Sequence, residues 1–204
     1  MKKLLMTMLA LALLAGCTSQ KSTPAEKPQP KPAEFETGRV AFQKMYVAAH
    51  GWARDAQPFR MQSTITADCN GHDGKSAVWW LGLASPSQKG VKPYTWSGTD
   101  AADAPSRGVT PGSEDSYSPT NSSTAIFDIA YLKIDSDQAF QVAQKHGGDK
   151  LLEKAADTPV TYILDWSGPT NTLIWHIIYG PSREDAKLVV DVNASSGDFI
   201  RVEK

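Results

Sequence analysis

The chain has 204 residues, with 21 basic and 22 acidic side chains and a formal net charge of −1. Neither sign forms a long run, which argues against nucleic-acid binding, because that depends on clustered Lys and Arg that neutralise phosphates. Once an N-terminal segment of different composition is set aside, roughly 165 residues remain, enough for one ordinary domain or two small ones sharing a core.

The first residues have the pattern of an export signal. Two lysines precede an apolar stretch over 4–14, which is shorter than the about 20 apolar residues that a membrane-spanning helix needs. The motif LAGC then ends at Cys17 and resembles the lipobox of bacterial lipoproteins. The resemblance implies cleavage of a signal peptide over 1–16, lipid on Cys17 and acylation by a fatty acid such as palmitate.

The residues that follow predict a tether. Over 17–37 four prolines are spaced among Lys and Glu. Proline lacks a backbone donor, so the segment favours an extended spacer between membrane and body. Thr18 stands where lipoproteins of the Gram-negative inner membrane usually carry Asp. The expected location is therefore the cell envelope, at the outer membrane and facing the periplasm.

The clearest folding signal lies in a second unit, predicted over 135–204. Asp135 precedes Gln138 by three residues, as in a capping box, and predicts a helix over 136–146 that ends at two glycines. Alternating apolar residues over 160–166 predict a first strand, and apolar stretches at 173–179, 187–192 and 199–202 predict three more, which together form an antiparallel meander.

The end of this unit resembles the PepSY module. The stretch LVVDVNASSGDFIRVE matches the module's apolar strand with an aspartate, short glycine turn and last apolar strand, at Asp191, Gly197 and Phe199. The resemblance implies a cystatin-like roll, in which a curved sheet wraps one helix. It also implies a secreted or membrane-attached protein and, as one candidate role, restraint of a peptidase. No catalytic residue comes with it.

A first unit is predicted over 38–134 because parts of the second are repeated in it. SPSQKGVK at 85–92 is similar to GPSREDAK at 180–187, and this alignment places Trp80 on Trp175. AFQ occurs at 41–43 and again at 139–141. We predict a helix over 38–55, strands at 59–68, 77–85 and 91–97, a long inserted loop over 98–123, and a fourth strand at 126–132.

The expected fold class is therefore α+β, with two tandem units, each a helix and its own four-stranded antiparallel sheet. The repeated phrase is interpreted as the same hairpin turn in both copies.

No motif predicts catalysis, a metal or a cofactor. The chain's histidines lack the spacing of a metal motif, and no serine or cysteine lies in a nucleophile signature. Once Cys17 carries lipid, Cys69 is the remaining thiol. It is expected to be buried, to react, or to pair with another chain.

The tryptophans predict a binding surface instead. Trp79 and Trp80 are adjacent on a strand and must point to opposite faces, and the strand with Trp175 and His176 is apolar on both faces. Either the two units pack together and bury the second face, or that face is a groove for a peptide, a lipid or a protein. The proposed surface is Trp79, Trp80, Trp96, Trp175 and His176.

The expected function is that of a non-catalytic, lipid-anchored protein that binds an envelope protein or restrains a peptidase. Two alternatives stay open: a carrier of a small apolar ligand or lipid, and an enzyme with scattered catalytic residues.

Overall fold

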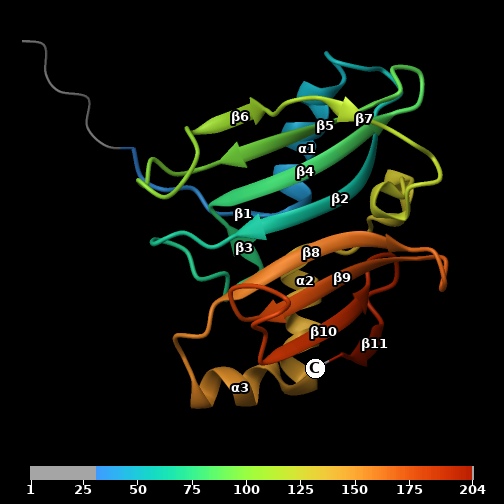
Figure 1. Cartoon of the computed structure of the whole chain (residues 1–204). Helices are drawn as coiled ribbons and strands as arrows, with labels where there is room; N and C mark the ends of the chain where they lie inside the picture. The colour runs from blue at the N-terminus through green and yellow to red at the C-terminus, as the bar shows by residue number, and fades with distance from the viewer. Residues whose placement is uncertain (1–30, 204) are drawn as a thin grey trace, which may run out of the picture.

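The computed structural model describes residues 31–203, which form a mixed α+β body (Figure 1). The predicted signal peptide over 1–16, Cys17 and most of the predicted tether lie outside the described residues. Across residues 31–203, no helix is both long and apolar enough to cross a membrane.

One large antiparallel sheet of nine strands organises the body (Figure 1). Its order is β11-β10-β9-β8-β2-β4-β5-β6, with β7 paired to β5. These strands are β2 (Gln57–Thr64), β4 (Val78–Ser85), β5 (Gly90–Ser97), β6 (Gly108–Pro111), β7 (Asp115–Ser116), β8 (Val160–Ser167), β9 (Thr172–Tyr179), β10 (Leu188–Asn193) and β11 (Phe199–Val202). A separate pair joins β1 (Glu36–Thr37) to β3 (Lys75–Ser76).

Helices cover one face of this sheet. α1 (Gly38–Ala49) packs on β4 and β5, and α2 (Ser136–Ala143) packs on β9 and β10 (Figure 1). α2 is continued by a π-helical turn, η3 (Gln144–Gly148), and a short helix, α3 (Asp149–Lys154). Two 3-10 turns precede it, η1 (Ser122–Thr124) and η2 (Ile129–Tyr131).

The core lies between the helices and the sheet. It is continuous from one half to the other, because the Trp79 ring contacts both Tyr162 and Trp175, with ring centroids 6.0 and 6.3 Å apart. All three side chains have no exposed surface. Burial of this apolar area, worth about 25 cal/mol per Å², holds the two halves as one body.

The two main helices begin side by side. The capping box predicted from Asp135 and Gln138 is confirmed. Asp135 also reaches the other helix, because its Oδ1 accepts from the Arg39 N–H at 2.9 Å. Ser136 Oγ accepts from the Gly38 N–H at 2.7 Å. Free N–H groups at the start of α1 are thus satisfied by the start of α2.

Two expectations about the sheet are corrected. The strands do not form two separate sheets, because β2 and β8 pair and join the halves edge to edge. For the same reason the two halves do not pack face to face, so the expectation that each buries the outer face of the other's sheet is also corrected.

The inserted loop is also corrected. Within the predicted loop over 98–123, β6 and β7 pair with β5, and Val109 packs against the core. The predicted strand over 126–132 is absent, and this stretch contains η2. The chain reaches its fourth strand early because residues 98–107 reverse its direction, and β6 pairs with β5 from Gly108, which takes a φ of +103°.

The repeated phrase does connect corresponding strands, as predicted. In the first half it joins β4 to β5, and in the second it joins β9 to β10.

Candidate functional site: the open face of the sheet

We call the face of the sheet opposite α1 and α2 the open face. Side chains alternate across a strand, so the residues between the core positions point to it. In the second half these residues form a charged network, and in the first half they include an aromatic pair.

The predicted surface residues divide between the two faces. Trp79, Trp96 and Trp175 lie in the core, at 0, 4 and 0% exposure. The prediction that they line a surface is corrected, because they share the face that packs on the helices. Trp80 and His176 occupy the alternate positions and point to the open face.

The aromatic pair lies over a glycine. Phe59 occupies an irregularity in the pairing of β2 with β4, and its ring meets the ring of Trp80 edge to face at 6.1 Å between centroids. A Cβ atom at Gly82 would lie 2.3 Å from Phe59 and 2.6 Å from Trp80. Glycine is therefore required for both rings to pack here, and both remain partly exposed.

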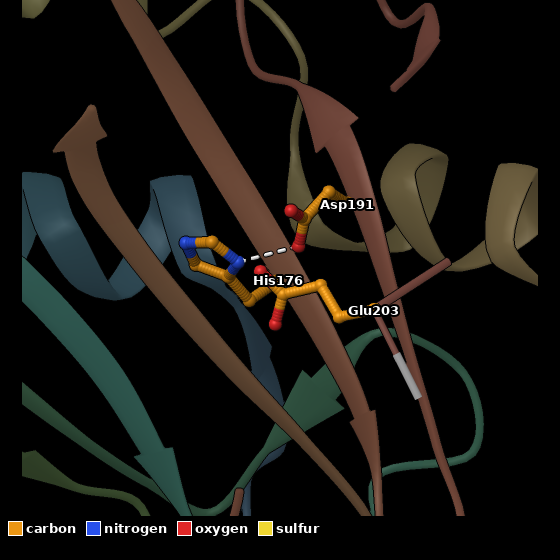
Figure 2. A group of neighbouring side chains, drawn as sticks. All are labelled: His176, Asp191 and Glu203. Atoms are coloured by element: carbon orange, nitrogen blue, oxygen red, sulfur yellow. Dashed lines mark hydrogen bonds and ion pairs between the residues drawn. The ribbon is translucent and has the colours of Figure 1, made fainter. Parts of the chain in front are cut away.

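His176 is the centre of the charged network (Figure 2). Its Nδ1 lies 2.5 Å from Asp191 Oδ1 on β10, and its Nε2 lies 3.1 Å from Asp165 Oδ1 on β8. Only the imidazolium can donate from both nitrogens at once. The arrangement therefore holds a charged histidine that is 4% exposed, between two carboxylates.

Arginines complete the network at its outer side. Arg201 Nε donates to the second oxygen of Asp191 at 2.9 Å, and Arg201 Nη2 donates to Glu203 at 2.6 Å. Arg183, on the β9–β10 connection, donates to the other oxygen of Glu203 and lies 3.4 Å from His176 Nδ1. Asp191, with no exposed surface, is thus matched by two cationic groups.

The same contacts shift the pKa values of the buried groups. Burial opposes the charge on His176, but hydrogen bonds and the charges of Asp165 and Asp191 outweigh it and raise the pKa of the imidazole. Burial likewise opposes ionisation of both carboxyls, and the contact with His176 outweighs it and lowers the pKa of each. All three groups are therefore held in their charged forms.

A metal site is a second interpretation of this cluster. His176, Asp191 and Glu203 bring possible ligand atoms within 4.8 Å of one another (Figure 2). However, both carboxylates already accept from guanidinium groups, which would have to leave before a cation could enter. The contacts favour a salt-bridge cluster over a metal centre.

The network is also unsuited to base catalysis. A histidine that activates a nucleophile needs one nitrogen free to take the proton. In His176 both nitrogens contact carboxylates.

The remaining candidate residues lie apart from the open-face network. Cys69 is partly buried in the loop after β2, and burial raises the pKa of its thiol. His50 contacts the Tyr46 carbonyl at the end of α1, and His146 stacks on Phe199 at 3.7 Å. His72 bonds the carbonyl of Thr158 at 2.7 Å.

Sequence reasoning missed the network as a unit. Asp165, His176 and Asp191 come from three different strands, and no local motif links them. One signal could have indicated it: each of these polar residues lies within an otherwise apolar strand, on the face opposite to the core residues of that strand.

Comparisons with known proteins identify the fold alone. No family model matches the chain, and no curated protein matches it. A solved structure from Clostridium difficile 630, described as a "putative lipoprotein (CD1622)", is similar with a TM-score of 0.51 and 11% identity. The match covers 80% of this chain and 91% of that one, so the likeness extends over most of the mixed α+β body.

Proposed function

We propose that this is a lipid-anchored protein of the bacterial cell envelope that binds a partner protein on the open face and catalyses no reaction. The observation that carries the proposal is the partly exposed Phe59–Trp80 pair beside Arg60, on central strands of the sheet and on the face opposite α1 and α2. Tryptophan and arginine are enriched among residues that dominate binding energy. A peptidase is the first class of partner to test.

The charged network supports binding over catalysis. It fixes the shape of one half of the open face, because its members bond one another across β8, β9 and β10. A rigid surface loses little conformational entropy on binding.

The anchor is supported by two observations. The LAGC motif places Cys17 where lipoproteins carry their lipid, and the similar solved structure is described as a "putative lipoprotein". The end of the tether is held to the body, because Arg107 Nη2 donates to the carbonyls of Lys31 and Pro32 at 3.2 and 3.1 Å. We place the protein at the outer membrane, facing the periplasm.

We further propose that the body arose from two tandem PepSY-like units. A helix followed by a meander occurs twice along the chain. In the sheet, the strands of the first half run outward from β2 as β4, β5 and β6, and those of the second half run outward from β8 as β9, β10 and β11. A duplicated unit that pairs through its first strand gives this arrangement.

The alternative of an apolar-ligand carrier draws no support from the space between helices and sheet. Buried side chains such as Trp79, Tyr162 and Tyr179 fill that layer.

Site-specific photocrosslinking in the native host tests the proposal. A photoreactive phenylalanine analogue is placed at Trp80 or Gln62 on the open face, and at Val47 as the control. Val47 lies on α1 and is 75% exposed. We expect one protein to crosslink from both open-face positions and not from Val47. Equal crosslinking from all three positions, or crosslinking from Val47 alone, would refute the open face as the binding surface.

A further inference from the structure

The two halves of the sheet separate on one side of their junction. β2 and β8 pair only at Arg60–Asp165, Met61–Leu164 and Gln62–Ile163. At the next position the Tyr162 N–H donates to the side-chain oxygen of Ser63 at 2.9 Å in place of a backbone carbonyl. A hollow of about 360 Å³, which we call the seam hollow, opens on the open face at this point.

The seam hollow combines an apolar floor with cationic walls. Ile163, which is partly buried, forms the accessible part of the floor, and Ile178 lies behind it at 1% exposure; Pro181 also lines the hollow. Arg60 from β2 and Arg183 from the β9–β10 connection also line it. Its volume is at the small end of the roughly 300–1,000 Å³ of ligand pockets, and such pockets pair apolar walls with a few placed polar groups.

Arg60 has donors to offer in this hollow. Its Nη1 lies 3.7 Å from Asp165 Oδ2, which is beyond hydrogen-bond distance. A guanidinium carries five N–H donors in a planar fork that suits a carboxylate. The ion pair with Asp165 thus orients Arg60 and leaves donors for a further carboxylate.

Glu184 places a carboxylate of the chain itself at the mouth of the hollow. Hydrogen bonds within the turn, from its own backbone and from Ser182, lower the pKa of its carboxyl, and the charges of Arg183 and Arg60 lower it further. Glu184 is exposed and belongs to the lining, so its negative charge competes with any incoming anion.

We propose that the seam hollow binds the C-terminal residue of an extended segment of the partner protein, with its carboxylate on Arg60 and its apolar side chain on the isoleucine floor. A chain terminus presents a carboxylate and a side chain from the same Cα atom, which matches a small hollow that has both features. An Asp or Glu side chain would leave the floor uncovered. This inference rests on the proposed function of the open face.

The test is an NMR titration of the mature chain without lipid. The probe is the peptide N-acetyl-Gly-Ala-Leu with a free C-terminal carboxylate. The same peptide as a C-terminal amide, and N-acetyl-Gly-Ala-Glu amide, are the matched probes. We expect the free-carboxylate peptide to shift the NMR signals of Ile163 and Gln62. Both amide peptides should bind at least about tenfold more weakly, because each lacks the C-terminal carboxylate that accepts a charged hydrogen bond.

Two variants are expected to act in opposite directions. Arg60→Gln should weaken binding of the free-carboxylate peptide about tenfold, and Glu184→Gln should strengthen it severalfold by removing a competing charge. Arg54→Gln, at an exposed arginine outside the hollow, is the control. Urea unfolding confirms that each variant is folded.

Equal binding of the acid and amide peptides, or no effect of Arg60→Gln, would overturn the inference. Tighter binding of the Glu-containing amide would assign the hollow to acidic side chains and would also overturn it. These outcomes leave the proposed function intact if crosslinking from Trp80 succeeds. Conversely, the peptide can bind as expected while crosslinking fails, and then only the proposed function falls.

Discussion

Trp79 and Trp175 make the same hydrogen bond in the two halves of the chain. The Trp79 indole N–H donates to the Glu36 carbonyl and the Trp175 indole N–H to the Ile134 carbonyl, both at 2.9 Å. Each carbonyl lies two residues before the first residue of α1 or α2. Each tryptophan therefore fastens the second strand of its half to the entry of the helix.

This bond predicts matched losses of stability. Trp79→Phe and Trp175→Phe keep an aromatic ring but remove the donor, so each should lower the free energy of unfolding by about 1–3 kcal/mol. Trp80→Phe is the control, since Trp80 lies on the open face, and should cost less than about 0.5 kcal/mol. Urea unfolding measures all three. A cost for Trp80→Phe equal to the other two would refute the assignment of faces.

The equivalence also explains an error of the sequence alignment. Aligning the repeated phrases places Trp80 on Trp175, but the hydrogen bonds pair Trp79 with Trp175. A shift of one residue moves a strand's side chains to the opposite face. Trp79 pairs with Trp96 and Trp175 pairs with Val192, so the two halves are related by an offset of 96 residues (175 − 79 and 192 − 96), whereas aligning the repeated phrases used 95.

The charged network predicts a second stability effect. Asp191→Ala removes the buried carboxylate that accepts from His176 and Arg201, and leaves the histidine with one partner. Removing one member of a buried ion pair costs about 3–5 kcal/mol. Asp157→Ala, at an exposed position, should change the free energy of unfolding by less than about 0.5 kcal/mol. A loss below about 1 kcal/mol for Asp191→Ala would contradict a tightly coupled network.

The pKa shifts predict how stability varies with pH. Because the pKa of His176 is raised on folding, its contribution is complete below the unfolded value of about 6.5 and is lost as pH rises through the folded pKa. The pKa values of Asp165 and Asp191 are lowered, so their contribution is present above about 3.9 and is lost as pH falls through the folded pKa. The network is therefore most stabilising between about pH 4 and 6.5.

Urea unfolding of the wild type and His176→Gln from pH 5 to 9 measures this dependence. The difference in unfolding free energy between them should shrink as pH rises, because the pKa of His176 is raised on folding and its stabilising contribution is therefore lost progressively above about pH 6.5, whereas glutamine does not titrate. A difference that stays constant from pH 5 to 9 would show that His176 is neutral in the folded chain.

The lipid anchor gives a prediction outside the described residues. Cys17→Ser removes the thiol that carries the lipid, so the protein should move from the membrane fraction to the soluble fraction and lose labelling by a palmitate analogue. Ser19→Ala is the control two residues away. Unchanged membrane retention and labelling of Cys17→Ser would refute the lipobox interpretation.

Local sequence signals predicted the second half of the fold well. The capping box at Asp135 and the strands predicted at the positions of β8 and β9 are confirmed, because helix caps and strand-forming patterns depend on neighbouring residues. The first half was harder. Its fourth strand is the short β6 within a polar insertion, and its pairing with β5 depends on contacts distant in sequence.

The joining of the halves could not be predicted from such signals. It depends on β2 and β8, separated by about a hundred residues, and on which strand edges remain unpaired after each half folds. The open face, and with it the candidate site, follows from this junction.

The central claim is that the open face binds a partner protein. It is tested most directly by measuring the affinity of the crosslinked partner for the Trp80→Ala variant. If the open face binds that partner, truncating its most prominent aromatic residue should weaken binding about 30-fold, equivalent to about 2 kcal/mol, while Val47→Ala on the helix side leaves the affinity unchanged. Unchanged affinity for Trp80→Ala, or an equal loss for Val47→Ala, would contradict binding through the open face.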